Sequence, residues 1–335
     1  DLNMSQSTND SYPTALKVAM VTNNDLVVAQ IELLVAALRA KGNEFIDILK
    51  MGRTEMQDAV PMTVGQEFHA MAAALEEEIT FIRASEQPLF AINMGGTAIG
   101  TGLNAPAGYA QKTAAHLAKL TGKPYYKADD LIAATWDQHA FVAESGAMRS
   151  LAIKLSKIAS DLILLSSGPR AGLNEINLPP VQPGSSIMPG KVNPVMPELV
   201  NLVSFRVIGN DLSVALAARN GQLQLNAYEP LVAITVLESQ RLLTNTMATF
   251  RTRCVDGITV NEDTLSAYIE RTVGIVTALN PVIGYERATE LAKEAYSTNK
   301  GILEIVREQN ILSEEQIEEI LSPAALTGLD KKQYK

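Results

Sequence analysis

Residues 151–166 read LAIKLSKIASDLILLS, and this stretch decides the fold. Leucine and isoleucine recur in it at intervals of three and four residues, which is the spacing of one face of an α-helix. Small and aliphatic side chains also fill other sides of that helix. Because a helix that is apolar on most sides is buried on most sides, the stretch predicts the interior of a helical bundle.

The same period extends the stretch to a helix over 137–167, which Gly168 and Pro169 end. Other long helices are expected over 13–41 (interrupted near Asn23–Asn24), 64–85, 106–120, 194–220 and 229–255. Several exceed the ~10–14 residues of an average helix, which favours an all-α fold built on an elongated bundle. One chain would struggle to cover so many apolar faces, so we expect an oligomer core; a larger monomeric bundle stays open.

The character of the sequence changes after Gly257, where shorter and more charged helices are expected. They span 261–279, 285–298, 301–309 and 314–321. Breaks such as Asn280-Pro281 separate them. We therefore predict a central helical-bundle domain over residues 1–258 and a small helical C-terminal domain over residues 259–335.

The composition excludes several classes of protein. The 335 residues include 28 Lys+Arg and 37 Asp+Glu, a formal net charge of −9, and 47% are hydrophobic, so the chain can bury a core and is not mainly disordered. An acidic chain without a basic cluster argues against a nucleic-acid partner. Uncharged apolar runs such as residues 70–75 fall far short of the ~18–20 residues of a membrane span, so no membrane partner is expected.

Cys254 is the only cysteine, which rules out an internal disulfide framework. With three scattered histidines it forms no zinc pattern. We therefore expect no resident metal or organic cofactor, and an activating divalent metal stays open. Polar, motif-like sequence begins at once after Asp1, so we expect that upstream sequence is missing. The chain shows no signal-peptide or transit-like stretch, and the expected compartment is the cytoplasm.

Loops between long helices are the natural place for a site. Residues 5–10, SQSTND, gather hydroxyl and amide groups just before a helix start. They can cap that helix, or bind an anion together with the free N–H groups of its first turn, and both interpretations stay open. Residues 52–61, GRTEMQDAVP, taken alone predict a solvated loop.

Residues 94–104, MGGTAIGTGLN, contain four glycines and invite a phosphate-loop interpretation. No Gly-Lys-Ser/Thr follows, and no strand is expected before them, so that interpretation fails. A dinucleotide-binding loop is excluded because no βαβ context surrounds the glycines. We expect these glycines to allow close packing or a kink, and nucleotide binding remains a minor alternative.

Residues 183–198, PGSSIMPGKVNPVMPE, combine two glycines and four prolines with two serines, a lysine and an asparagine. Glycine permits hinge motion, whereas proline restricts the rest. A hydroxyl-rich loop with one cation predicts a lid that closes over an anionic substrate. The alternative is a plain connector in which Lys191 is solvated.

The segment GSSIMPGKVNP resembles the signature of the aspartase/fumarase superfamily, and the match is long and specific. SQSTND followed by YPTA resembles the first shared region of that superfamily, and GRTEMQDAVPMT resembles the second, in the same order and spacing. NMSQSTNDSYPTA, NPVMPE and GQLQLNAYEP are more similar to the aspartase branch than to fumarases. The similarity extends over essentially the whole chain.

The resemblance implies a carbon–nitrogen lyase that reversibly eliminates ammonia from L-aspartate to give fumarate. It implies a homotetramer whose central domains form one helical bundle, with active sites that combine segments from three subunits. It also implies that the N-terminal domain of the family, which contributes to the site, is absent from this chain. An isolated fragment of this kind would have an incomplete site and could lack activity.

By the same resemblance, Ser185 is the base that removes a proton from Cβ of the substrate. Lys191 and Asn193 bind the β-carboxylate that becomes an aci-carboxylate, and Ser186 hydrogen-bonds to it. Because serine is a poor base in water, positive charge and backbone N–H donors must favour its alkoxide. Preorganised donors must also stabilise the dianionic intermediate.

The rest of the substrate, including its amino group, is assigned by resemblance to Ser7, Thr8 and Asn9, and Thr54 contributes a hydroxyl. Glu55 departs from the family pattern, which commonly has His or Gln there. An ionised Glu is repelled by a dicarboxylate and attracted by an ammonium group. The hypothesis is that Glu55 contacts the amino group or a neighbouring cation, and the alternative is that it points away.

Two other functions stay open. Fumarate hydratase is one, because hydration and deamination share the same type of intermediate, and an assay for ammonia against malate separates the two. The other is a non-catalytic helical scaffold or incomplete fragment of the superfamily, against which the presence of Ser185, Lys191 and Asn193 argues.

Overall fold

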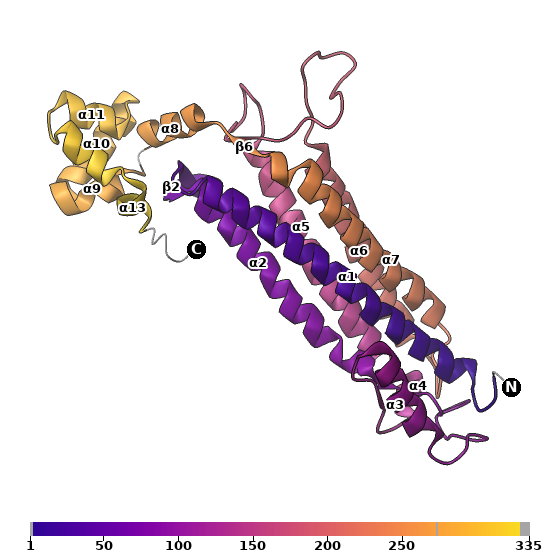
Figure 1. The fold of residues 1–335 in the computed structure, drawn as a ribbon. Coiled ribbons are helices and arrows are strands. Elements are labelled where there is room, and N and C mark those ends of the chain that lie inside the picture. The colour runs from indigo at the N-terminus through magenta and orange to yellow at the C-terminus, as the bar shows by residue number, and fades with distance from the viewer. Residues whose placement is uncertain (1–2, 273, 329–335) are drawn as a thin grey trace. The chain divides into compact units, whose positions relative to one another are not determined.

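The computed structural model describes residues 3–272 and 274–328 (Figure 1). Thirteen α-helices and only short strands lie in these residues, so the predicted all-α class is confirmed. The chain divides into two compact units. Unit 1 comprises the residues up to 35, 74–161 and 195–252, and unit 2 comprises 36–73, 162–194 and the residues from 253 onward.

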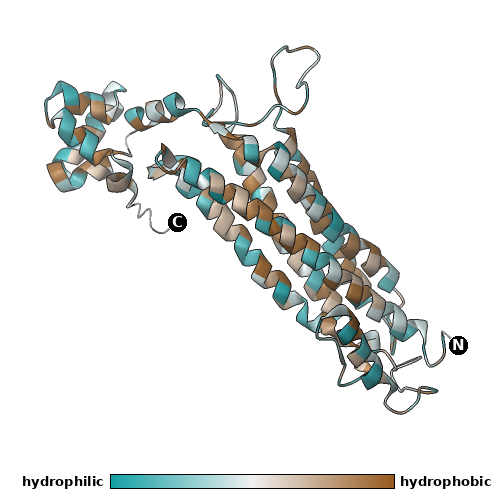
Figure 2. Cartoon of the chain, viewed as in Figure 1, coloured by the Kyte–Doolittle hydropathy of each residue, from teal (hydrophilic) through white to brown (hydrophobic). Residues whose placement is uncertain are grey.

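Unit 1 is a helical bundle, in which parts of five long helices lie side by side (Figure 1). These helices are α1 (Thr8–Glu44), α2 (Val64–Ser85), α5 (His139–Leu165), α6 (Val195–Arg219) and α7 (Glu229–Arg253). Buried apolar side chains of α1, α5, α6 and α7 belong to one core cluster that includes Met20, Phe141, Val214 and Val236. Figure 2 shows apolar residues along the whole length of the long helices, as expected for a bundle interior.

The first helix begins earlier than predicted and Pro13 lies inside it, not at its start. Proline has no N–H, so the carbonyl of Asn9, four residues earlier, receives no bond from the helix ladder. Asn93 Nδ2 donates to that carbonyl at 2.9 Å instead. A side chain from a distant loop therefore makes Pro13 tolerable within the helix.

The predicted interruption of this helix near Asn23–Asn24 is also wrong, because α1 is continuous. Asn24 is fully buried, and its side chain bonds to other helices rather than to its own backbone. Its Nδ2 donates to Glu144 Oε2 at 3.0 Å, and its Oδ1 accepts from Gln240 Nε2 at 2.7 Å. With both groups satisfied, the asparagine does not compete with the helix.

Smaller elements close one end of the bundle in unit 1. They are the 3₁₀ turn η1 (Gln87–Phe90), strands β3 (Ala91–Ile92) and β4 (Tyr126–Lys127), and helices α3 (Tyr109–Thr121) and α4 (Ala133–Trp136). β3 pairs in parallel with β4. A two-residue strand thus precedes the glycine-rich segment, contrary to the prediction. A phosphate loop still lacks its Gly-Lys-Ser/Thr.

By length and composition alone, α1 and α6 are apolar enough to cross a membrane. A search for uncharged runs misses them because their apolar windows contain isolated charges. Both helices also carry polar side chains bonded to their neighbours in unit 1. On α6, Asn210 Nδ2 donates to Ser239 Oγ at 3.0 Å, and Asp211 Oδ1 accepts from Ser145 Oγ at 2.7 Å. These bonds place α1 and α6 as bundle helices in this structure.

In unit 2 the segment predicted as a solvated loop is a β-hairpin. Strand β1 (Leu49–Thr54) pairs antiparallel with β2 (Gln57–Thr63), with an irregularity between Met51 and Arg53. Met51 is buried in the core cluster of unit 2. Most of the outward-facing residues of the hairpin are exposed and many are polar, so the composition of this segment resembles that of a solvated loop.

The C-terminal helices of unit 2 are α8 (Glu262–Arg271), α9 (Val276–Ile283), α10 (Tyr285–Thr298), α11 (Ile302–Glu308), α12 (Glu314–Ile320) and α13 (Pro323–Thr327). The single helix predicted over 261–279 is two helices. Gly274 lies between them, where a Cβ would come within 2.8 Å of the Ala59 carbonyl oxygen. The close approach to β2 therefore ends the first helix.

The predicted lid spans irregular chain in unit 2. Before it, strand β5 (Ile176–Asn177) pairs antiparallel with β6 (Thr259–Val260), which follows the 3₁₀ turn η2 (Val255–Gly257). Asn177 Nδ2 donates to Thr259 Oγ1 at 3.1 Å, across this pairing. The lid thus leaves from a fixed base and returns into α6, which begins at Val195.

Candidate active site

The first predicted site segment forms the start of α1. Ser7 Oγ accepts the backbone N–H of Asn9 at 3.1 Å, and Asp10 Oδ1 accepts the backbone N–H of Ser7 at 2.9 Å. These reciprocal bonds satisfy donors that a helix start leaves open. The Thr8 side chain is exposed. Ser7 and Asp10 therefore cap the helix, which is one of the two roles predicted for this segment.

The same segment is joined to the glycine-rich residues 93–102. Asn9 Nδ2 donates to the Ala98 carbonyl at 2.7 Å. The second carboxyl oxygen of Asp10 accepts the N–H groups of Gly95 at 3.1 Å and Thr97 at 2.9 Å. Asp10 is fully buried. The glycine-rich residues therefore pack against the start of α1 and hold it through hydrogen bonds, as the close-packing interpretation predicts.

Thr54 and Glu55 lie at the tip of the β1–β2 hairpin, and both are exposed. Glu55 and Met56 form its two-residue turn with φ of 52° and 64°. Turns of this kind usually contain Asn-Gly, because positive φ is costly for other residues. The hairpin tip thus holds two residues in a backbone conformation that their side chains disfavour, a feature typical of functional positions.

A buried ionic cluster fastens the base of this hairpin. Lys50 Nζ lies 2.7 Å from Glu67 Oε2 and 2.9 Å from Glu175 Oε2, and Arg53 pairs with the other oxygen of Glu175. Lys50 and Glu175 are almost completely buried. The Arg53 guanidinium also lies 5.5 Å from the ring centroid of Tyr268. These ion pairs attach strand β1 to Glu67 and Glu175, and so fix the position of the exposed tip of the β1–β2 hairpin.

The lid arranges its own serine and asparagine. Ser185 Oγ accepts the backbone N–H groups of Met188 at 3.1 Å and Ile187 at 3.3 Å. Asn193 Nδ2 donates to the Gly184 carbonyl at 3.0 Å, which joins the two limbs of the loop. The donors that a serine alkoxide needs are therefore present around Ser185.

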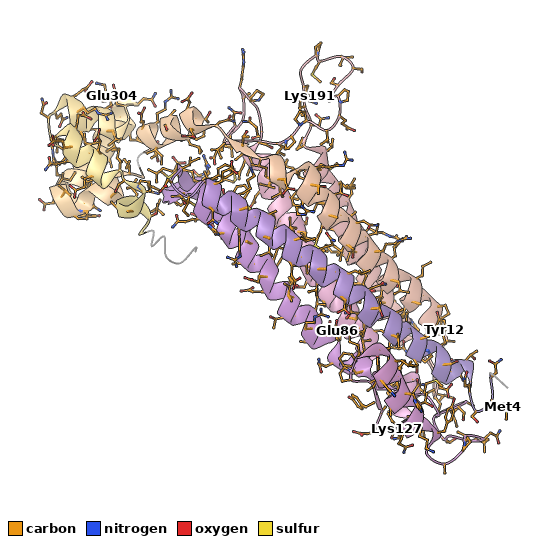
Figure 3. All side chains as sticks on the ribbon, viewed as in Figure 1. Met4, Tyr12, Glu86, Lys127, Lys191 and Glu304 are labelled. Atoms are coloured by element: carbon orange, nitrogen blue, oxygen red, sulfur yellow. The ribbon has the colours of Figure 1, made fainter. Side chains whose placement is uncertain are left out.

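Lys191 and Ser186 are exposed on the same loop, and Figure 3 labels Lys191 there. A cavity of about 520 Å³ lies beneath the loop in unit 2, lined by Lys191, Asn193, Ser167 and Asn174 among others. A second cavity of about 470 Å³ is lined by Ser185 and Lys191. The loop therefore brings its cation, its amide and its serine to two cavities.

The predicted site residues fall into three groups. Ser7, Thr8 and Asn9 belong to unit 1, whereas the other six belong to unit 2: Thr54, Glu55, Ser185, Ser186, Lys191 and Asn193. Within the described part of unit 2, no hydrogen bond or ion pair joins the hairpin tip to the lid. No arrangement of His, Cys, Asp or Glu that could hold a metal ion occurs in residues 3–272 and 274–328.

Several supporting residues escape sequence reasoning. Asp10 stands inside a quoted motif, but its link to Gly95 and Thr97 spans more than eighty positions. Glu175 lies in a segment without any motif, and only its burial beside two cations marks it. Pro13 is the one signal that could have pointed to the glycine-rich residues, since a proline inside a helix leaves an acceptor to be satisfied.

An all-α helical bundle with polar, hydroxyl-rich loops is the frame that carries these candidate residues. A family model described as "Lyase" matches residues 1–209, and one described as "Fumarase C C-terminus" matches residues 275–328. An aspartate ammonia-lyase of Pseudomonas aeruginosa is 54% identical over 324 residues, which are 96% of this chain and 68% of that protein. The chain belongs to the aspartate ammonia-lyase family of the fumarate lyase superfamily.

Other relatives agree. The aspartate ammonia-lyase of Escherichia coli is 49% identical over 96% of this chain and 67% of its own length. That of Corynebacterium glutamicum is 51% identical over 96% of this chain and 61% of its own length. A fumarate lyase:delta crystallin from Brucella melitensis superposes with a TM-score of 0.92 at 49% identity, covering 96% of this chain and 70% of that one. A class II fumarase from Schistosoma mansoni superposes with a TM-score of 0.88 at 35% sequence identity, and the shares of the two chains that are covered are the same. The chain thus spans about two thirds of the length of its relatives.

Proposed function

We propose that this chain carries the lyase machinery for the reversible conversion of L-aspartate to fumarate and ammonia. The first step removes a proton from Cβ and places the electron pair on the adjacent carboxylate as an aci-carboxylate. The second step expels the amino group from Cα and forms the double bond. The observation that carries the proposal is Ser185, whose hydroxyl oxygen accepts two backbone N–H groups.

Ser185 is the proposed base. A Cβ proton next to a carboxylate is weakly acidic, so the base must be charged and held in place. The N–H groups of Ile187 and Met188 stabilise negative charge on the serine oxygen. The ammonium group of Lys191, on the same loop, adds positive charge as the loop closes.

Lys191, Asn193 and Ser186 are the proposed ligands of the β-carboxylate. This group gains a second negative charge in the intermediate, so fixed donors there stabilise the transition state more than the substrate. One N–H of the Asn193 amide is engaged by Gly184, which leaves the other for a ligand. The exposed ammonium of Lys191 supplies the cation.

Ser7, Thr8, Asn9 and Thr54 are proposed to hold the α-carboxylate and the amino group. The hydroxyl groups of Ser7, Thr8 and Thr54 are donors that suit a carboxylate. The exposed carboxylate of Glu55, in its positive-φ turn, is proposed to attract the substrate ammonium. No cofactor takes part in this scheme.

We also propose that the active protein is a homotetramer in which segments of different subunits complete each site. The support is an apolar stripe on α6, formed by Leu202, Phe205, Leu212 and Leu216, which are all more than half exposed. These residues and Gly209 follow a seven-residue repeat, the pattern of a helix that packs against another helix. A cytoplasmic location is proposed because the lone, buried Cys254 suits a reducing compartment.

The domain boundary near residue 258 remains a proposal. The matched C-terminal segment begins at residue 275, after that boundary. The outermost residues, 1–2 and 329–335, lie outside the described residues.

The test is Ser185→Ala in the full-length protein, followed by fumarate formation from L-aspartate. Loss of a positioned base should lower kcat by about 100-fold to 10,000-fold. Ser297→Ala makes the same change at an exposed serine of α10 and should leave kcat unchanged. Malate formation from fumarate without ammonia release would instead identify a hydratase, and equal activity of Ser185→Ala would exclude this serine as the base.

A further inference from the structure

The glycine-rich residues 93–102 have no role in the scheme above, yet the structure ties them to the start of α1 at three points. We call this contact between the start of α1 and residues 93–102 the junction. Across it, the Asp10 carboxylate accepts the backbone N–H groups of Ser7 at 2.9 Å, Thr97 at 2.9 Å and Gly95 at 3.1 Å. A fully buried carboxyl group bonded to three backbone donors holds those donors in one geometry. Asp10 thus joins two segments distant in sequence.

The second and third points both involve Asn9. Its carbonyl, left open by Pro13, accepts from Asn93 Nδ2 at 2.9 Å. Its side-chain Nδ2 donates to the Ala98 carbonyl at 2.7 Å. The loop engages one N–H of the Asn9 amide, so Oδ1 and the second N–H remain to contact a ligand. An amide oxygen only accepts hydrogen bonds, and so suits an ammonium group rather than a carboxylate.

Thr97 indicates that this junction does more than pack. Its φ is 56°, a conformation that a β-branched residue adopts only when its surroundings enforce it. Its hydroxyl is buried and has no hydrogen-bond partner within the protein. Gly95, with φ of 87°, could not be replaced, because a Cβ would lie 2.8 Å from the Cβ of Ala110. The loop is therefore held in a strained and closely packed form.

We propose that Asp10 and residues 93–102 position Asn9, so that its Oδ1 accepts a hydrogen bond from the substrate ammonium. Asp10 and Asn93 are positioning residues in this scheme. The loop thereby contributes to the choice of an amino acid over a dicarboxylate without an amino group. The inference deepens the proposed function and depends on it.

The experiment compares Asp10→Asn and Asn93→Ala with wild type in the full-length protein. Asp25→Asn is the matched control: it makes the same change on the same helix, at a partly exposed carboxylate that pairs with Arg83 and Lys123. The readouts are kcat and KM for L-aspartate and the inhibition constant of succinate, a dicarboxylate without an amino group. Circular dichroism and a thermal melt check the fold.

Positioning predicts that KM for L-aspartate rises about tenfold or more in both variants, as expected for a lost hydrogen bond to a charged group. The inhibition constant of succinate should change less than about twofold, since only the amino-group contact is altered. A purely structural role would weaken both ligands alike, or lower only the melting temperature, and would overturn the inference.

The two variants keep the inference testable if one fails to fold. Asn93→Ala removes the bonds from Asn93 Nδ2 to the Asn9 carbonyl and to Thr135 Oγ1, and leaves the three bonds of Asp10 intact. Unchanged kinetics in a folded Asn93→Ala protein would count against the inference even if Asp10→Asn were lost to misfolding. A wild-type protein that does not deaminate L-aspartate would overturn the proposed function itself, which is a different outcome from active variants that match wild type.

Discussion

At the scale of single residues, the most informative side chain outside the site is Glu144. It is fully buried in unit 1, where Asn24 and Ser85 donate to one of its oxygens and Gln240 donates to the other. Burial raises its pKa to about 7, against the hydrogen bonds, which lower it, while the nearby Glu86 raises it further. The bundle therefore contains a carboxyl group that exchanges its proton near neutral pH and is largely protonated only below it.

This pKa predicts a pH-dependent stability. The folded protein holds a proton on Glu144 that the unfolded chain releases near pH 4.5, so the contribution of Glu144 to stability is greatest below that pH and declines as pH rises towards about 7. The slope contributed by Glu144 should be about 1 kcal/mol per pH unit in that window. Urea unfolding of wild type and Glu144→Gln between about pH 5 and pH 8 measures it, and the variant should lose this slope. The same slope in both proteins would contradict the assignment.

At the scale of elements, the lid depends on the contact between its two limbs. A Cβ at Gly184 would lie 1.9 Å from the Lys191 carbonyl oxygen, whereas nothing lies within 4 Å of one at Gly190. Gly184→Ala should therefore separate the limbs and lower kcat/KM by about 100-fold or more, because small misplacements of reacting groups are costly. Gly190→Ala, in the same loop, should cost much less, although its φ of 83° adds some strain.

Both variants should melt close to wild type, since the lid is largely exposed. Kinetics and a thermal melt on the same samples separate a displaced loop from an unfolded one. Equal activity of the two variants would show that the limb contact has no part in catalysis.

Elements also show where sequence reasoning succeeds. The helix over 64–85 was predicted with its observed bounds, because its apolar period and its flanks agree locally. The predictions of a helix break at Asn23–Asn24 and of a solvated loop over 52–61 were both wrong, and for the same reason. The groups that satisfy Asn24 lie more than a hundred positions away, and those that anchor β1 include Glu175. Local pattern carries no information on such partners.

The site divides in the same way. The side chains proposed to bind substrate stand in contiguous polar motifs, so Ser185, Lys191 and Asn193 can be picked out from sequence and resemblance. Side chains that hold the motifs, such as Asp10 and Asn93, act through bonds to backbone atoms elsewhere in the chain. Only coordinates reveal which backbone atoms those are.

At the scale of the whole molecule, the apolar stripe of α6 predicts association. Phe205 and Leu212 are 61% and 63% exposed in the isolated chain. Replacing both with Glu should dissociate the proposed tetramer, because each buried charge without a partner opposes the apolar contact. Sedimentation velocity measures the assembly, and a double Glu substitution at the exposed Tyr285 and Tyr296 is the control. A variant that remains tetrameric would place the interface elsewhere.

The same stripe has a consequence for biosynthesis. Helix α6 is apolar enough to resemble a membrane segment, and in the proposed tetramer its stripe stays exposed on a newly made protomer until other subunits bind. Holdase chaperones and proteases recognise such bare apolar helices, so the yield of active protein should depend on how quickly copies meet. A low rate of synthesis would then favour degradation of the unassembled protomers. Co-translational assembly of neighbouring nascent chains would favour folded, active protein.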